Sequence, residues 1–207
     1  MSKNFDYSLK DISSNLEKSL KEAELLGEGH NGVVFLLKNN KAIKIFRRMS
    51  VWKDESSILK RVRKSRFFPR IYEAKPGYII REYVDGVRLD KYLRRGNLDE
   101  DLCKELYLMI LEFERLGFKR IDIRCKDIYI QDDYTLKIID PKNNYKKRVS
   151  FPRHLFKGLF KRDELNRFLN YVAEIDEKRA HIWREKFEIY AEDKKLIKNS
   201  KSLKVSV

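Results

Sequence analysis

The run of residues 27–46 constrains the fold more than any other segment of this chain. It starts with glycines in the pattern G-x-G-x-x-G-x-V and continues directly into the apolar residues 33–37. A polar turn at 38–40 and a second apolar stretch at 41–46 follow, so the segment predicts an antiparallel hairpin. The glycines are Gly27, Gly29 and Gly32. In dinucleotide-binding folds this spacing opens a helix, whereas a strand follows here. The pattern therefore favours a loop whose backbone N–H groups can approach phosphate oxygens, with an ordinary glycine hairpin as the alternative.

Two charged residues fall inside the apolar patterns that follow. Strand alternation places Lys44 on the same face as Ala42. A helix is expected to begin near Ser50, and Glu55 lies within its apolar stripe. The other residues of that stripe are Val51, Ile58 and Val62. Because a carboxylate in such a stripe is costly unless it is paired, we expect Glu55 to form an ion pair with Lys44. A partly exposed Glu55 at the edge of the stripe is the alternative.

The remainder of the chain changes from strands to helices. Apolar residues at helical spacing predict a helix at 7–22 and another at 99–116 that ends at Gly117. Strands are expected at 70–73, 78–84, 128–130 and 135–139. Beyond residue 144 the pattern is mostly helical. A strand-rich first part followed by a helix-rich second part predicts the α+β class.

The charge of the chain is strongly basic. The formal net charge is +15, and residues 141–207 hold 18 basic and 9 acidic side chains. This excess is typical of a solvated surface, or of a protein that binds RNA, another polyanion or phosphate groups. The run 151–157 mixes aromatic and basic residues as nucleic-acid surfaces can. A lobe helix with its apolar side chains in the core is the alternative reading of that run.

Cysteine content and hydropathy bear on the compartment. Two cysteines cannot build a disulfide framework, and the N-terminus has no signal-peptide pattern. No apolar run approaches the ~18 residues of a membrane span. We therefore expect a cytoplasmic protein in which Cys125 is structural. The three histidines (His30, His154 and His181) have no metal-ligand spacing.

The order of these motifs resembles that of the protein kinase-like superfamily over about residues 23–145. Residues 80–86 are similar to a kinase hinge, and Asp122 and Asp127 keep the five-residue step of the catalytic loop H-R-D-x-x-x-x-N. Asp140 follows Asp122 by eighteen residues and ends an apolar strand, like the aspartate of D-F-G. The chain looks most similar to compact atypical kinases of the RIO type and to small bacterial Ser/Thr kinase-like proteins.

The resemblance implies an α+β, bilobal protein kinase-like fold with an antiparallel-sheet N-lobe and a reduced helical C-lobe. The expected organisation is a helical extension at 1–22, the N-lobe at 23–84, the C-lobe at 85–195 and a basic tail at 196–207.

The resemblance also implies an ATP- and Mg-dependent phosphotransferase that transfers the γ-phosphoryl group to a hydroxyl acceptor, foremost a protein Ser or Thr. In such an enzyme Asp122 orients the acceptor hydroxyl and takes its proton, while Arg124 reaches the transferred group. Asp127 and Asp140 would hold Mg²⁺.

The same resemblance assigns the nucleotide contacts. Lys44, fixed by Glu55, would hold the α- and β-phosphates. The further contacts would come from Gly27, Gly29 and Gly32 at the phosphates, the backbone of Glu82 and Val84 at the adenine edge, and Val34, Ala42, Tyr129 and Ile139 on the adenine faces.

Several departures from the kinase pattern keep alternatives open. Ile121 replaces the arginine of H-R-D, so control by phosphorylation of an activation loop is not expected. Pro141 follows Asp140, no A-P-E motif occurs, and the chain after Asp140 is too short for a full peptide platform. One alternative is a pseudokinase that acts as a nucleotide-binding regulatory module. Another is an atypical kinase that acts with RNA, through the basic C-terminal part, or on a small molecule.

Overall fold

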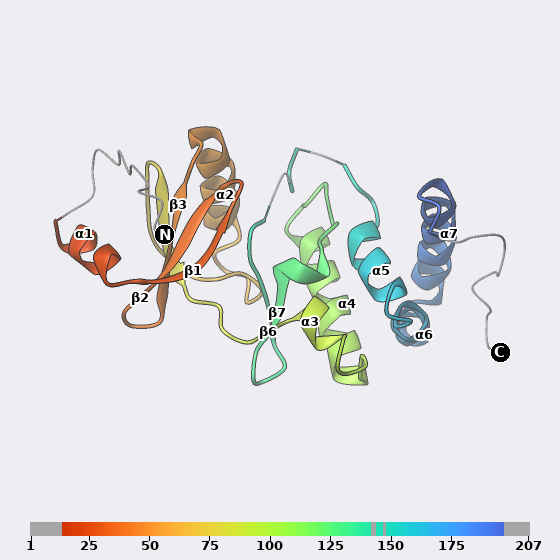
Figure 1. The fold of residues 1–207 in the computed structure, drawn as a ribbon. Helices are drawn as coiled ribbons and strands as arrows, with labels where there is room; N and C mark the ends of the chain where they lie inside the picture. The colour runs from red at the N-terminus through yellow and green to blue at the C-terminus, as the bar shows by residue number, and fades with distance from the viewer. Residues whose placement is uncertain (1–13, 142–143, 147, 197–207) are drawn as a thin grey trace. The chain divides into compact units, whose positions relative to one another are not determined.

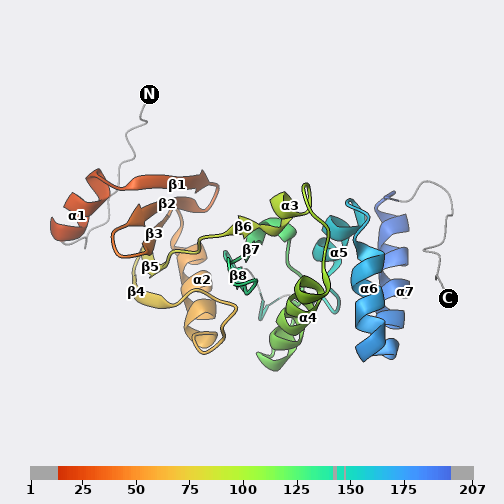
Figure 2. The same cartoon turned by 90° about the horizontal axis from the view of Figure 1, so that it is seen from below.

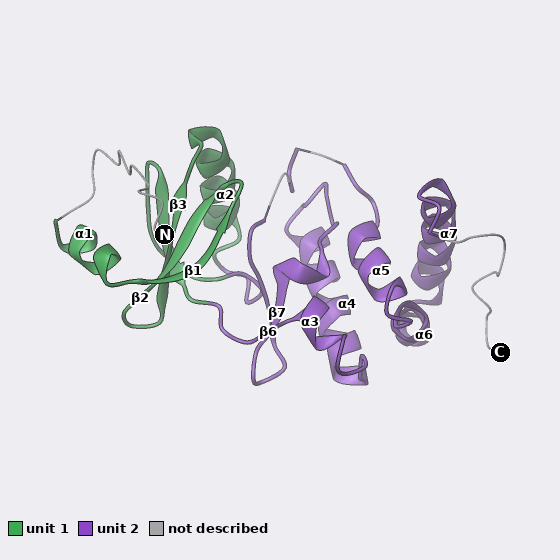
Figure 3. Cartoon of the chain, in the orientation of Figure 1, with its two compact units in different colours: residues 1–63, 69–83 green, residues 64–68, 84–207 purple. Residues whose placement is uncertain are grey.

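The computed structural model describes residues 14–141, 144–146 and 148–196, which fold as two compact units. Residues 1–63 and 69–83 form unit 1, and residues 64–68 and 84–207 form unit 2 (Figure 3). The fold is α+β, as the sequence predicts.

Unit 1 is built on a five-stranded antiparallel sheet (Figure 1). Its strands are β1 (Glu24–Gly29), β2 (Gly32–Leu37), β3 (Lys41–Phe46), β4 (Ile71–Lys75) and β5 (Tyr78–Glu82), in the order β1-β2-β3-β5-β4. The hairpin predicted from the glycine-rich run is confirmed, because β2 and β3 pair antiparallel over their whole length. The turn between them uses Asn39 and Asn40 at φ of 60° and 54°, a backbone conformation that asparagine tolerates well.

Two helices cover opposite faces of this sheet (Figures 1 and 2). Helix α1 (Ser14–Lys21) packs Leu16 and Leu20 on the face that carries the buried core of the unit. That core consists of Val33, Ile43, Ile45 and Tyr78. Helix α2 (Met49–Arg61) lies against the other face, toward which Lys44 points by strand alternation. The predicted helix at 7–22 is therefore present from Ser14, and its residues 7–13 lie outside the described part of the chain.

Two boundaries in unit 1 differ from the sequence expectation. Helix α2 begins at Met49, so Ser50 is not its N-cap; Arg48, with extended backbone, takes that position without a side-chain cap. Strand β5 ends at Glu82 instead of residue 84. Beyond Glu82 the amide of Tyr83 donates to the carbonyl of Asn40 in the β2–β3 turn, which takes the chain out of the ladder.

Unit 2 combines a small antiparallel sheet with helices. Its strands are β6 (Val87–Arg88), β7 (Ile128–Ile130) and β8 (Leu136–Ile138), paired in that order. Its helices are α3 (Leu89–Tyr92), α4 (Glu100–Arg115), α5 (Arg153–Phe160), α6 (Leu165–Ile175) and α7 (Glu177–Asp193), with a 3-10 turn at Cys125–Asp127. The hairpin predicted at 128–139 corresponds to β7 and β8.

Helix α4 has the ends that the sequence predicts. The side chain of Asp99 accepts a hydrogen bond from the backbone N–H of Leu102 at 2.8 Å, which caps the N-terminus. Gly117, at φ 68°, ends the helix in the left-handed conformation.

Phe67 and Phe68 attach the linker of residues 64–68 to unit 2. The ring centroid of Phe68 lies 6.2 Å from that of Phe113 and 6.1 Å from that of Phe118. The carbonyl of Phe67 accepts a hydrogen bond from the amide of Ile138 at 2.7 Å. Aromatic burial thus fixes this short segment beside β8.

The C-terminal helices α5, α6 and α7 lie next to one another (Figure 2), and aromatic side chains from all three pack around Phe156 of α5. The rings of Phe168, Trp183 and Phe187 surround it at centroid distances of 5.4–6.1 Å. Leu155 and Leu159 are also fully buried. The structure therefore supports the core-helix reading of residues 151–157, because the ring of Phe156 is not accessible to a nucleic-acid base. Among the described residues, no helix combines the length and apolarity needed to cross a bilayer.

Candidate functional site

The glycine-rich hairpin of unit 1 contains glycines of two kinds. Gly29 pairs with Gly32 across the two-residue turn of His30 and Asn31. A Cβ at Gly32 would lie 2.0 Å from the carbonyl oxygen of Ile45, so packing requires glycine there. A Cβ at Gly27 or Gly29 would meet no atom within 4 Å. Neither packing nor a positive φ requires these two glycines, so they leave open space beside the backbone of β1.

The ion pair predicted between Lys44 and Glu55 is present in unit 1. The ammonium of Lys44 on β3 lies 2.6 Å from Oε2 of Glu55 on α2. The two side chains are only 10% and 4% exposed, so the pair is shielded from water. The Lys44 ammonium also lies 4.9 Å from the centroid of the Phe46 ring. A buried cation of this kind is fixed in position by its counter-ion.

Two of the residues expected at adenine share the face of Lys44. Val34 is the register partner of Lys44 in the β2–β3 ladder, and Ala42 lies two residues before it. Ala42 is buried and Val34 is half-buried. Val34, Ala42 and Lys44 therefore lie on one face of the sheet, next to one another.

The backbone groups expected to bind adenine are partly engaged within the protein. The N–H of Glu82 donates to the carbonyl of Arg70 at 2.8 Å, and its carbonyl accepts from the guanidinium of Arg81 at 3.0 Å. Val84 is buried and belongs to unit 2. Tyr129 on β7 and Ile139 after β8 are half-buried residues of unit 2.

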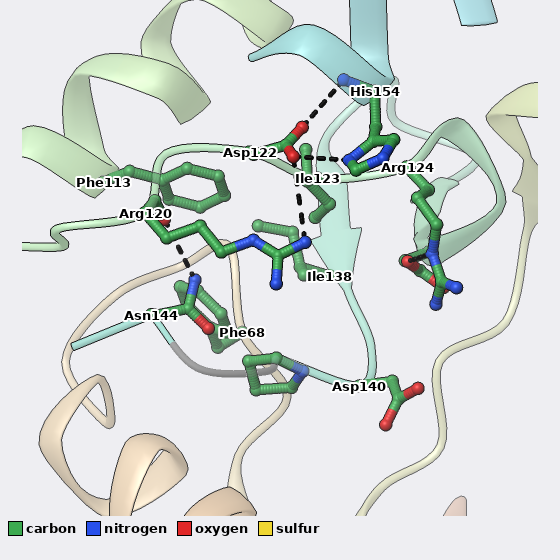
Figure 4. Close-up of a pocket in the computed structure, with 12 residues that line it drawn as sticks. Phe68, Phe113, Arg120, Asp122, Ile123, Arg124, Ile138, Asp140, Asn144 and His154 are labelled. Atoms are coloured by element: carbon green, nitrogen blue, oxygen red, sulfur yellow. Dashed lines mark hydrogen bonds and ion pairs between the residues drawn. The ribbon is translucent and has the colours of Figure 1, made fainter. Parts of the chain in front are cut away.

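A pocket of about 300 Å³ in unit 2 gathers the predicted catalytic and metal-binding residues (Figure 4). Its apolar wall includes Phe68, Phe113 and Ile138. Its polar lining includes Arg120, Asp122, Arg124, Asp127, Asp140, Asn144 and His154. The loop after α4, the 3-10 turn and the end of β8 thus bring Asp122, Asp127, Asp140 and Arg124 to one cavity.

Asp122 is enclosed by cations (Figure 4). One oxygen accepts the backbone N–H of His154 at 2.8 Å, and the other contacts the ring Nδ1 of the same residue. Nε of Arg153 donates to that second oxygen at 3.2 Å, and the guanidinium of Arg120 lies 3.7 Å from it. The side chain of Asp122 is 0% exposed. Burial alone would raise the pKa of Asp122, but the hydrogen bonds from His154 and Arg153 outweigh it and hold the pKa below its usual value.

Arg124 and Asp127 are bound to each other. The guanidinium donates from Nε at 2.6 Å and from Nη2 at 2.9 Å to the two carboxylate oxygens, a bidentate arrangement. This hydrogen-bonded pair raises the pKa of Arg124 above its ordinary value. The guanidinium of Arg124 is expected to reach a transferred phosphoryl group, and the carboxylate of Asp127 is expected to bind metal. In this conformation the two groups bind each other.

Asp140 has an unusual backbone conformation. Its φ is 60°, which non-glycine residues adopt at an energetic cost. The preceding amide, of Ile139, donates to the carbonyl of Asp127 at 3.0 Å and ties the two predicted metal-binding segments together. Within the described ranges no three His, Cys, Asp or Glu side chains are grouped as a metal site.

Cys125 lies in the same loop and has a packing role, as expected. It is 5% exposed, and burial raises the pKa of its thiol to about 12. A Cβ on Gly158 of α5 would lie 2.3 Å from its sulfur. This close approach holds α5, and with it the residues at the start of that helix, against the loop that carries Asp122.

No motif in the sequence indicates which residues hold Asp122. Arg153 and His154 are 31 and 32 residues away along the chain, and no motif spacing connects them to the catalytic loop. The run 151–157 that contains both residues suggested a core helix or an RNA surface, and neither interpretation connects it with Asp122.

Comparisons with known proteins give one distant likeness. No protein-family model matches the chain. A curated protein of Bacillus subtilis (strain 168), named "Putative serine/threonine-protein kinase YrzF", is 25% identical over 130 residues. The match covers 60% of this chain and about 60% of the length of that relative. The likeness supports a distant kinase-like relationship, in keeping with the α+β fold.

Proposed function

We propose that this protein is an ATP- and Mg-dependent phosphotransferase that transfers the γ-phosphoryl group to a hydroxyl acceptor. One observation carries the proposal: three carboxylates at the spacing of a kinase catalytic loop and D-F-G aspartate line a single pocket of unit 2. They are Asp122, Asp127 and Asp140. Phosphoryl transfer needs positioning and charge neutralisation more than covalent chemistry by the protein, and such groups suit it.

In this proposal unit 1 binds the phosphates. The Lys44 ammonium is oriented by Glu55 at 2.6 Å. The space beside Gly27 and Gly29 would admit phosphate oxygens close to backbone N–H groups. Val34 and Ala42, on the face of Lys44, would contact the base of the nucleotide.

The residues of unit 2 fit a magnesium ion. Mg²⁺ is usually held by one or two carboxylates, with phosphate oxygens and water completing its shell. Asp127 and Asp140, which both line the pocket, supply this number of carboxylates. When bound, the ion would neutralise charge on the phosphate oxygens. Arg124 must then release Asp127, and its planar fork would become available to the transferred group.

The acceptor is proposed to be a protein Ser or Thr, and the name of the B. subtilis relative supports this choice. A small-molecule alcohol is the second possibility, because the same groups serve either acceptor. The side chain of Phe156 is buried. Because its ring is not accessible to a nucleic-acid base, the argument for an RNA surface on α5 no longer holds.

The proposal is tested by incubating the purified full-length chain with Mg·[γ-³²P]ATP and dephosphorylated casein. We expect labelled protein to accumulate, and Asp122→Asn to reduce the rate at least ~100-fold, the scale on which acid–base groups contribute. Labelling by the Asp122→Asn variant at the wild-type rate would contradict the assignment of the site.

A nucleotide-binding regulatory module is the second candidate. The enclosed carboxylate of Asp122 and the Arg124–Asp127 pair favour it, since both engage groups that catalysis requires. It predicts Mg-dependent ATP binding with no ATP consumption, so binding and turnover measured on the same preparation distinguish the two candidates.

A further inference from the structure

The proton acceptor of the proposed reaction needs access to its substrate, and Asp122 lacks it. Its side chain is 0% exposed, and both oxygens already accept hydrogen bonds. By contrast, the side chain of His154 is 36% exposed and lines the same pocket (Figure 4). A substrate hydroxyl in this pocket can therefore reach the imidazole more easily than the carboxylate.

The hydrogen bond to Asp122 fixes the state of the imidazole. An ionised carboxylate accepts hydrogen bonds and donates none. The lowered pKa of Asp122 keeps it ionised at neutral pH, so Nδ1 of His154 must carry the hydrogen in their contact. In the neutral ring the other nitrogen, Nε2, then has a lone pair and can accept a proton.

We propose that His154 is the general base of this site and that Asp122 is its positioning partner. The inference rests on the proposed function. The acceptor hydroxyl gives its proton to Nε2 while its oxygen forms a bond to the γ-phosphorus. The bond between that phosphorus and the bridging oxygen breaks, and its electron pair leaves with ADP. The imidazolium is stabilised by the Asp122 carboxylate at Nδ1 and later releases the proton to water.

The arrangement is the carboxylate–imidazole dyad that activates hydroxyl groups in other enzymes. The backbone N–H of His154 donates to Oδ1 of Asp122 at 2.8 Å, while the ring contacts Oδ2, so the carboxylate holds both the ring and the main chain at the start of α5. The rotation of the ring is thereby restricted.

The charged groups around the dyad come from three segments. Arg120 lies in the strand-like segment before Asp122, Arg153 at the start of α5, and Arg124 in the catalytic loop with its partner Asp127. The cations favour the ionised form of the Asp122 carboxylate, which is the form that accepts the hydrogen from Nδ1 of His154.

His154→Asn is the most informative substitution. The amide nitrogen of Asn takes the position of Nδ1 and can still donate to Asp122, but the amide has no basic nitrogen. With Mg·ATP and dephosphorylated casein as probe acceptor, we expect kcat to fall at least ~100-fold while KM for ATP stays the same. Wild-type kcat should fall as the medium is made acidic and the imidazole gains a proton, and His154→Asn should lose this dependence.

Two control variants distinguish a role of His154 in proton transfer from a purely structural role. Arg153→Gln removes another hydrogen bond to Asp122 from a residue that does not line the pocket. It should lower kcat less and retain the acid limb of the pH profile. His181→Asn changes an exposed histidine on α7, paired with Glu185 at 3.4 Å, and should behave as wild type.

The outcomes are distinguishable. An active wild type whose His154→Asn variant keeps its rate and pH profile overturns the inference and leaves the phosphotransferase proposal intact. A faster His154→Asn variant also overturns it and identifies the contact with Asp122 as inhibitory. Wild-type protein without turnover overturns both proposals. If His154→Asn does not fold, a wild-type kcat that is constant from pH 5 to 8 overturns the inference by itself.

Discussion

The ammonium of Lys44 on β3 and a carboxylate oxygen of Glu55 on α2 are 2.6 Å apart in an environment that is almost closed to water. Removing one partner of such a pair leaves a buried charge without compensation, which typically costs about 3–5 kcal/mol of folding free energy. Replacing both with apolar residues avoids that cost.

We therefore predict that Lys44→Met and Glu55→Leu each destabilise the protein by about 3 kcal/mol or more. The double variant should regain most of this loss while still failing to bind ATP. Urea denaturation of the four proteins gives the coupling energy. Additive losses in the double variant would contradict a directly coupled buried pair.

Substitutions at two of the hairpin glycines should affect different properties of the protein, namely the stability of the fold and the binding of Mg·ATP. Gly32→Ala places a Cβ 2.0 Å from the Ile45 carbonyl and should destabilise strongly or prevent folding. Gly29→Ala meets no atom, so we expect a stability change within about 0.5 kcal/mol and weaker binding of Mg·ATP. Thermal denaturation with isothermal titration calorimetry checks both. Equal ATP affinity in Gly29→Ala and wild type would show that the loop does not contact phosphates.

Asp122 should contribute to the acid sensitivity of the fold. Its pKa is lower in the folded protein than the ~3.9 of an unfolded aspartate. The folded state therefore binds fewer protons, and the stabilisation is complete above pH ~4 and is lost as the pH falls through the folded pKa. Unfolding free energies measured from pH 6 to 2 should decrease less steeply for Asp122→Asn than for wild type. The same slope in both would indicate that the carboxylate titrates as it does in the unfolded chain.

The pair of Arg124 and Asp127 gives a prediction about metal dependence. The guanidinium is 42% exposed, so Arg124→Gln should change stability by less than ~1 kcal/mol. Freed of its partner, Asp127 should bind Mg²⁺ more readily, and half-saturation of ATP binding should need less magnesium. Turnover should nevertheless fall, because the cation for the transferred group is lost. If Arg124→Gln needed more magnesium than wild type, this would contradict the idea that Arg124 and the ion compete for Asp127.

The sequence predicted local features well because each rested on a short-range rule. Strand alternation and helical spacing were sufficient to pair Lys44 with Glu55, and the C-terminal end of α4 followed from Gly117. The start of α2 was missed by one residue because Arg48 takes the extended N-cap conformation without a side-chain bond.

The environment of Asp122 could not be predicted from the sequence. His154 reaches it because α5 packs on the loop that carries Asp122, where Gly158 allows close contact with Cys125. Contacts of this kind depend on tertiary packing and leave no periodic pattern in the chain.

Thermal unfolding with ATP, in the presence and absence of Mg²⁺, tests the proposed roles of Lys44 and Asp140 in Mg·ATP binding most directly. A ligand at 100 times its Kd stabilises a protein by about 2.7 kcal/mol, which for a chain of this size raises Tm by about 5–10 °C. We predict this rise for wild type with ATP and Mg²⁺ together, and its loss in both Lys44→Ala and Asp140→Ala. An undiminished rise in either variant would contradict the account.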